Sequence, residues 1–152
     1  MRKIEKEVIG AFVKGETKAM GNTESAINPT TRDLDLLLDG NRIATMSNRD
    51  GVKKLWVSNA GWPTRTTQSR LNALFRLWPK DIAAHVYTRG GIQYLSNGLH
   101  GTFELTALRK GAVLVYQWES RSASAWQDRL RRLLDTADDH SEYLPRSKQT
   151  IH

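Results

Sequence analysis

Cysteine is absent from this sequence of 152 residues, and long apolar runs are absent as well. Without cysteine the chain has no disulfides and no thiolate metal sites, which fits a reducing compartment. The longest apolar runs are five or six residues, far short of the roughly 20 needed to span a membrane. The first residues alternate charged and apolar side chains and lack the apolar block of a signal peptide. We therefore expect no membrane partner and no cofactor.

Acidic residues are missing from one long stretch in the middle of the chain. The thirty residues between Asp50 and Asp81 contain six cations but no acid, and they hold three of the five tryptophans. The cations are Lys53, Lys54, Arg65, Arg70, Arg76 and Lys80, and the tryptophans are Trp56, Trp62 and Trp78. Cations neutralise phosphates and release counterions, while aromatic rings stack on unpaired bases for about 1–3 kcal/mol each. This composition predicts nucleic-acid binding, with single strands favoured over duplex.

The net charge of +7 is unevenly distributed. Residues 1–38 sum to zero, residues 39–134 carry fifteen bases and six acids, and residues 135–152 carry two bases and four acids. A charge that served solubility alone would be spread more evenly along the chain. The middle of the chain is therefore the expected binding region.

The pattern of apolar residues and turns predicts an α+β fold of antiparallel, hairpin-connected sheets. We expect helices over residues 3–14, 66–78 and about 122–136. Expected strands lie at 33–38, 42–47, 52–58, 82–88, 92–96, 101–107 and 112–118, and the last, which is apolar on both faces, is expected to be central. The Asp39-Gly40-Asn41 sequence is the clearest hairpin signal. Residues 1–140 are predicted to form one domain and residues 141–152 a flexible tail.

The expected strand 52–58 and helix 66–78 place the tryptophans differently. Leu71, Leu74 and Trp78 lie on one stripe of the helix, which predicts that Trp78 is in the core. Trp56 shares a strand face with Lys54, so it either packs under a helix or lies on an exposed binding face.

The loop at residues 59–67 is the segment richest in binding chemistry. Gly61 and Pro63 can present Trp62 on a rigid turn, and a cap at Thr66 or Thr67 would begin the helix. Free N–H groups at a helix N-terminus favour a phosphate, which Arg65 and Arg70 could also contact. The alternative is that the threonines only cap the helix and that Trp62 covers the sheet edge.

The predicted nucleic-acid-binding residues come from the acid-free stretch, from the following hairpin and from the C-terminal helix. They are Lys53, Lys54, Trp56, Trp62, Arg65, Thr67, Arg70, Arg76, Arg89, Arg129, Arg131 and Arg132. The apolar stripe of the C-terminal helix, which contains Trp126, Leu130 and Leu133, would either cap the sheet or pair with a second subunit. We therefore expect a homo-oligomer.

Several short segments resemble small bacteriophage proteins. They are G-N-T at 21–23, D-G-N-R-I-A at 39–44, A-G-W-x-T-x-T-T-x-x-R-L-N at 60–72 and Y-L-S-N-G at 94–98. In overall character the chain is similar to the single-stranded-DNA-binding RNA polymerase cofactors of phages that carry a giant virion RNA polymerase. That resemblance implies a transcription cofactor that holds melted promoter DNA, recruits a phage RNA polymerase and works in the host bacterial cytoplasm.

Two other functions remain open from the sequence. Asp33 and Asp35, together with Glu104 or His85, could form the metal site of a nuclease, although a solvated strand face explains the same spacing. Alternatively, a small basic phage protein could bind and inhibit an acidic host protein. We expect a binding protein that is not an enzyme.

Overall fold

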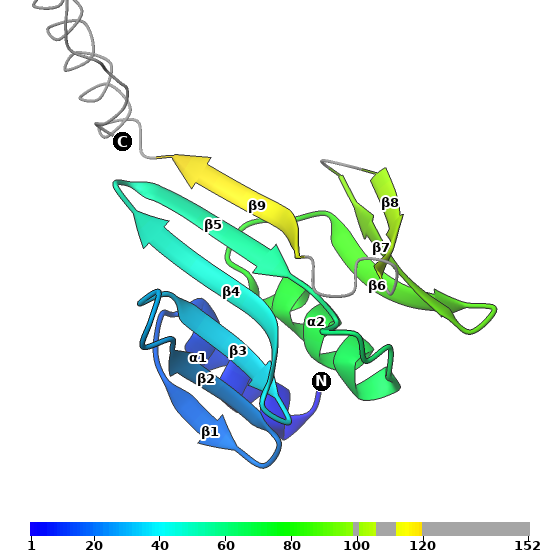
Figure 1. Cartoon of the computed structure of the whole chain (residues 1–152), viewed down its shortest axis with the longest axis horizontal. Helices are drawn as coiled ribbons and strands as arrows, with labels where there is room; N and C mark the ends of the chain where they lie inside the picture. Colours follow the sequence, from blue (N-terminus) through cyan, green and yellow to red (C-terminus); the bar gives the residue numbers. More distant parts are fainter. Residues whose placement is uncertain (99–100, 106–111, 120–152) are drawn as a thin grey trace, which may run out of the picture. The chain divides into compact units, whose positions relative to one another are not determined.

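The computed structural model describes residues 1–98, 101–105 and 112–119 (Figure 1). The chain divides into two compact units, the first made of residues 1–47 and 54–117, the second of residues 48–53 and 118–152. The C-terminal helix predicted at 122–136, with Arg129, Arg131 and Arg132, lies outside the described residues, as does the predicted tail. In the part of the chain that is described, no helix is long and apolar enough to cross a membrane.

The described elements form an α+β fold of antiparallel sheets, as predicted. The chain begins with a π-helical segment η1 (Glu5–Ile9) that continues into α1 (Gly10–Val13). The first sheet has the strand order β1-β2-β3-β4-β5-β9, and the second has the order β6-β7-β8. The first sheet contains β1 (Lys18–Met20), β2 (Thr23–Ile27), β3 (Leu34–Leu38), β4 (Asn41–Arg49), β5 (Val52–Val57) and β9 (Val113–Glu119). The second contains β6 (Ala84–Arg89), β7 (Ile92–Asn97) and β8 (Gly101–Glu104), and α2 (Arg65–Leu77) lies between β5 and β6 in the sequence.

The predicted hairpins are confirmed at their turns. Leu38 pairs with Asn41 across β3 and β4, so Asp39 and Gly40 form a two-residue loop. Both have positive φ, 52° and 79°, as a primed turn requires. The same combination of residues and angles recurs in the hairpin tip at Asp50 and Gly51, with φ of 53° and 77°.

The hairpin of β1 and β2 was not predicted from the sequence. Met20 pairs with Thr23, so the chain reverses at residues 21–22. The inward positions of β2 are Thr23 and Ser25, each 1% exposed. Because these buried side chains are polar, β2 lacks the alternation of apolar and polar residues that reveals a half-buried strand.

The position predicted for the strand at residues 112–118 was wrong. We expected a central strand, yet β9 is at the end of the six-strand order, next to β5. Its apolar character still has a structural reason, since Val113 and Val115 are buried in the hydrophobic core. Leu114 and Tyr116, which alternate with these valines, are only partly buried.

Helix α2 is close to its predicted limits, but its cap lies two or three residues earlier than expected. Its N-cap is Thr64, whose hydroxyl accepts a hydrogen bond from the Thr67 N–H, so neither Thr66 nor Thr67 is the cap. α2 packs against η1, α1 and β6 (Figure 1). The prediction that Trp78 belongs to the core is confirmed: it is 5% exposed, and its ring meets Tyr116 edge to face at 5.3 Å.

Candidate nucleic-acid interface

Strand β5 separates the core from a polar outer face. Leu55 and Val57 are fully buried, whereas Lys54, Trp56 and Ser58 are only partly buried, as the alternation along the strand predicted. On β4, Arg42 is exposed and Thr45 is partly buried. The outer face therefore presents an indole beside two cations.

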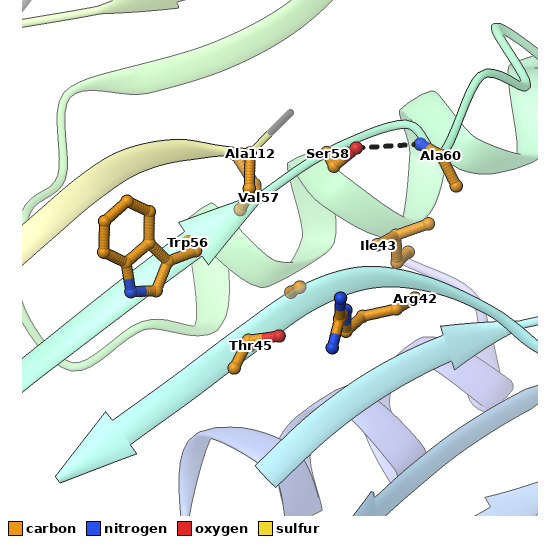
Figure 2. Close-up of a pocket in the computed structure, with 9 residues that line it drawn as sticks. Arg42, Ile43, Thr45, Trp56, Val57, Ser58, Ala60 and Ala112 are labelled. Carbon is orange, nitrogen blue, oxygen red and sulfur yellow. Dashed lines mark hydrogen bonds between the residues drawn. The ribbon is translucent and has the colours of Figure 1, made fainter. Parts of the chain in front are cut away.

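A hollow of about 290 Å³ lies on this face. Figure 2 shows the Trp56 indole at one end of the hollow, with Thr45 and Arg42 along β4 at its lower side. Ala44, Ala60 and Ala112 also line it, and their small side chains leave the space open. A flat ligand could stack on Trp56 here while Arg42 contacts an anionic group.

A second hollow, of about 310 Å³, shares one lining residue, Ile43, with the first. Trp62, which is 59% exposed, lines this second hollow together with Thr64 and Thr66 of the α2 N-terminus. Asp39 and Asn41 of the β3–β4 turn also line it. Each of the two hollows therefore has its own tryptophan outside the core.

Buried amides hold the loop that carries Trp62. Asn59 is 1% exposed and Gln93 is fully buried, and the Asn59 side-chain N–H₂ donates to the Gln93 amide oxygen at 3.0 Å. Gln93 in turn donates to the Thr64 carbonyl at 3.2 Å. The backbone N–H groups of Gly61 and Trp62 donate to the side-chain and backbone oxygens of Asn59, at 2.9 and 2.8 Å. The exposed indole is thus held on a fixed turn.

Arg70 is not the surface cation that the sequence indicated. It is 3% exposed, and its guanidinium donates to Glu5 at 2.9 Å, to the Thr23 hydroxyl at 2.9 Å and to the Asn22 side chain at 3.2 Å. Leucine spacing on α2 turns Arg70 inward, where the N-terminal helical segment supplies the matching carboxylate. A guanidinium in this cluster has no surface for a phosphate.

The carboxylate of this cluster has a perturbed pKa. Burial raises the pKa of Glu5, but hydrogen bonds from Ser69, the Arg2 backbone and Arg70, together with the Arg70 charge, outweigh it. The net pKa of Glu5 therefore lies below its ordinary value.

Thr67 also differs from its predicted role. It is 1% exposed, its N–H is taken by the Thr64 hydroxyl at 3.1 Å, and the two hydroxyls lie 3.0 Å apart. The alternative prediction, that the threonines only cap the helix, fits Thr64, the N-cap, and Thr67, whose N–H donates to the cap. Thr66 remains at the wall of the second hollow.

The other predicted cations are distributed over several surfaces. Arg65, Arg76 and Arg89 are exposed, and Arg65 and Arg76 line a groove on the outer side of α2. Lys54 is on the face of Trp56. Lys53 belongs to the second compact unit.

Asp35, one of the acids considered for a nuclease, has structural partners. Asp35 is 5% exposed, and its carboxylate accepts hydrogen bonds from the Thr45 hydroxyl at 2.9 Å and from the Asn28 amide at 3.1 Å. Arg42 lies 3.9 Å from the same carboxylate. Over residues 1–98, 101–105 and 112–119, no group of three or more His, Asp or Glu residues could hold a metal ion.

Sequence reasoning missed a row of rings on the β6–β7 hairpin. Tyr87 stacks on Tyr94 with ring centroids 5.5 Å apart, and His85 lies 5.3 Å from Tyr87. The hairpin turn contained the signal. A two-residue loop at Gly90 and Gly91 places residue 87 opposite residue 94, as the observed register confirms.

The segment 1–124 matches the family model described as "Kyanoviridae Gp96 protein". No curated protein and no solved structure matches the chain. The match extends from the N-terminal helical segment through β9 and includes both hollows. The chain therefore belongs to the Kyanoviridae Gp96 protein family, a family of bacteriophage proteins.

Proposed function

We propose that this phage protein binds single-stranded DNA and performs no chemistry on it. The observation that carries the proposal is the presence of two hollows, each lined by a tryptophan that the core does not use. Unpaired bases could stack on Trp56 and Trp62, because every base has a π-face and stacking tolerates any sequence. A duplex keeps its bases stacked on one another and would gain nothing from these rings.

Charge supports the same assignment. Arg42 and Lys54 are near Trp56, and Arg65 follows the Trp62 loop, so cations accompany both indoles. Phosphates next to the stacked bases could contact these groups and release their counterions. Asp39 and Asn41 offer an acceptor and an amide to base edges in the second hollow.

We further propose that the bound strand is melted promoter DNA and that the protein recruits a phage RNA polymerase to it. This role is supported by membership of a phage family and by the resemblance of the chain, in overall character, to the single-stranded-DNA-binding RNA polymerase cofactors of phages. The site would then act in the host bacterial cytoplasm. Sequence-tolerant stacking suits a protein that must hold promoters of different sequence.

Fluorescence anisotropy with matched single-stranded DNA, duplex DNA and RNA, at two salt concentrations, tests the binding proposal. We expect the single strand to bind more tightly than the duplex, and affinity to fall steeply with salt. Trp56→Ala and Trp62→Ala should each weaken binding by about 1–3 kcal/mol. Trp118→Ala is the matched control, since Trp118 is 51% exposed but lies outside the hollows.

Equal or tighter binding to the duplex would refute the single-strand assignment. If neither oligonucleotide binds and the protein instead associates with an acidic host protein, the inhibitor function would replace it. The transcription role has a separate readout, which is polymerase-dependent RNA synthesis from a pre-melted template. Synthesis should rise on adding the wild-type protein and should not rise on adding Trp56→Ala.

A further inference from the structure

A third concave surface runs along the outer side of α2. It is an open groove of about 850 Å³, lined by Arg2, Arg65 and Arg76 and reaching Tyr87 on β6. Arg65 and Arg76 lie eleven residues apart, three helical turns, so they lie on the same side of the helix. Glu5 also lines the groove, but its carboxylate is paired with Arg70 at 2.9 Å. The Glu5 carboxylate therefore does not offset the positive charge of Arg2, Arg65 and Arg76, because Arg70 already neutralises it.

Tyr87 connects this groove to the row of rings on the β6–β7 hairpin. Its ring is inclined 24° to Tyr94 and 31° to His85, so three rings form a partly stacked series. Arg89 lies two residues further along β6, on the same face as Tyr87. Tyr87 therefore belongs both to the lining of the groove, with its arginines, and to the series of rings.

Side-chain hydrogen bonds fix the helix against the hairpin. The Asn72 amide donates to the Val86 carbonyl at 2.8 Å and accepts from the Val86 N–H at 2.7 Å, as a neighbouring strand would. The Thr88 hydroxyl donates to the Gln68 side chain at 2.7 Å. The spacing between the arginines and the rings is therefore set before any ligand binds.

We propose that the α2 groove and the ring series form a second binding surface for single-stranded nucleic acid. The phosphates lie along Arg2, Arg65 and Arg76, and unpaired bases extend the stack of His85, Tyr87 and Tyr94. Arginine suits phosphate because its donors match the phosphate oxygens in pairs. Glu104, which pairs with Tyr94 across β7 and β8, can accept a hydrogen bond from a base amino group.

This surface is separate from the two hollows, so it stands even if the hollows bind nothing. With both occupied, one protein contacts a strand at two places. Affinity then depends on strand length, because the second contact is made at a high effective concentration.

Charge-reversal variants test the groove by anisotropy with a single strand of about 16 nucleotides. Arg76→Glu should weaken binding by about tenfold more than Lys80→Glu, which changes the net charge equally but lies outside the groove. Tyr87→Leu should weaken binding, whereas Tyr87→Phe retains a ring and should bind as the wild type does. Circular dichroism confirms that each variant is folded.

Photocross-linking to a strand containing bromodeoxyuridine, followed by peptide mapping, locates the contact independently. We expect cross-links in peptides that contain Tyr87 and Tyr94, and these should persist in the Trp56→Ala, Trp62→Ala double variant. In the wild-type protein, an absence of cross-links at Trp56 and Trp62 would count against the hollows and leave this surface intact. The second surface is refuted if cross-links map only to the hollows and Arg76→Glu behaves as Lys80→Glu does. Equal binding of a duplex to the double variant would also refute it.

Discussion

The two sides of α2 carry the same residue type in opposite roles. On the inner side, Arg70 is 3% exposed and is held by Glu5, Thr23 and Asn22. On the outer side, Arg65 and Arg76 are exposed and line a groove. All three come from one acid-free stretch of sequence. A run of cations in the sequence therefore does not show that all of them lie on the surface. An acid from a distant segment, here Glu5, can pair with an arginine inside the fold.

Removing the inner arginine should have the largest effect. Arg70→Ala leaves the Glu5 carboxylate buried without its cation, and we expect a loss of about 3–5 kcal/mol in the free energy of unfolding. Urea unfolding followed by tryptophan fluorescence measures this loss. Arg76→Ala, on the other side of the same helix, is the control.

A paired replacement sharpens the result. Glu5→Gln combined with Arg70→Met removes both charges, so the double variant should be more stable than Arg70→Ala alone. A double variant as unstable as Arg70→Ala would show that packing, and not the unpaired carboxylate, explains the loss.

The contact between α2 and β6 should have the next largest effect. Asn72→Ala removes both hydrogen bonds to Val86, and leaving those backbone groups without partners should cost about 1–3 kcal/mol. Amide hydrogen exchange at Val86 should accelerate, because its N–H loses its acceptor. Asn72→Asp retains an acceptor for that N–H but no donor for the carbonyl, so it should protect the amide more than alanine does.

The inner cluster also predicts a dependence of stability on pH. Because the pKa of Glu5 in the folded protein is below its ordinary value of 4.5, its stabilisation is complete above that pH. It is lost as the pH falls through the folded pKa. Unfolding free energies measured across this acid range should decrease more for the wild type than for Glu5→Gln. Parallel curves for the two proteins would contradict the assignment of Glu5. Glu7 also has a lowered pKa, through Lys18, but that exposed pair should add little.

The outer arginines should have the smallest effect on stability. Arg65→Ala should change the free energy of unfolding by less than about 0.5 kcal/mol, because the side chain is exposed. The substitution should instead weaken DNA binding, and the slope of log K against log salt concentration should fall by about one. A marked loss of stability would mean that Arg65 has a structural partner, as Arg70 does.

Local chemistry was enough to predict the elements that depend on it. Asp-Gly pairs need positive φ and produced the expected turns, and the leucine spacing of α2 placed Trp78 in the core. The alternation along β5 separated Leu55 from Trp56. In each case the structure of the element is decided by residues close to one another in the sequence.

Elements that depend on distant partners could not be predicted in this way. Thr23 and Ser25 are polar, yet they are buried because Arg70 and the Glu16 carbonyl satisfy their hydroxyls. Asn59 and Gln93 lie 34 residues apart and meet only in the fold. The pattern of residues placed Trp56 on the strand face opposite Leu55, where the structure has it, but it treated Arg70 as a surface cation, which the fold buries. Nucleic-acid binding at Trp56 and Trp62 stays a prediction.

The fixed loop of Trp62 has a thermodynamic consequence. A tryptophan on a mobile loop would lose backbone freedom when a ligand binds, and that loss would reduce affinity. The buried amides of Asn59 and Gln93 impose this ordering during folding instead. Association at Trp62 should therefore proceed without a slow rearrangement step, and calorimetry should show little of the entropy loss that accompanies the ordering of a loop.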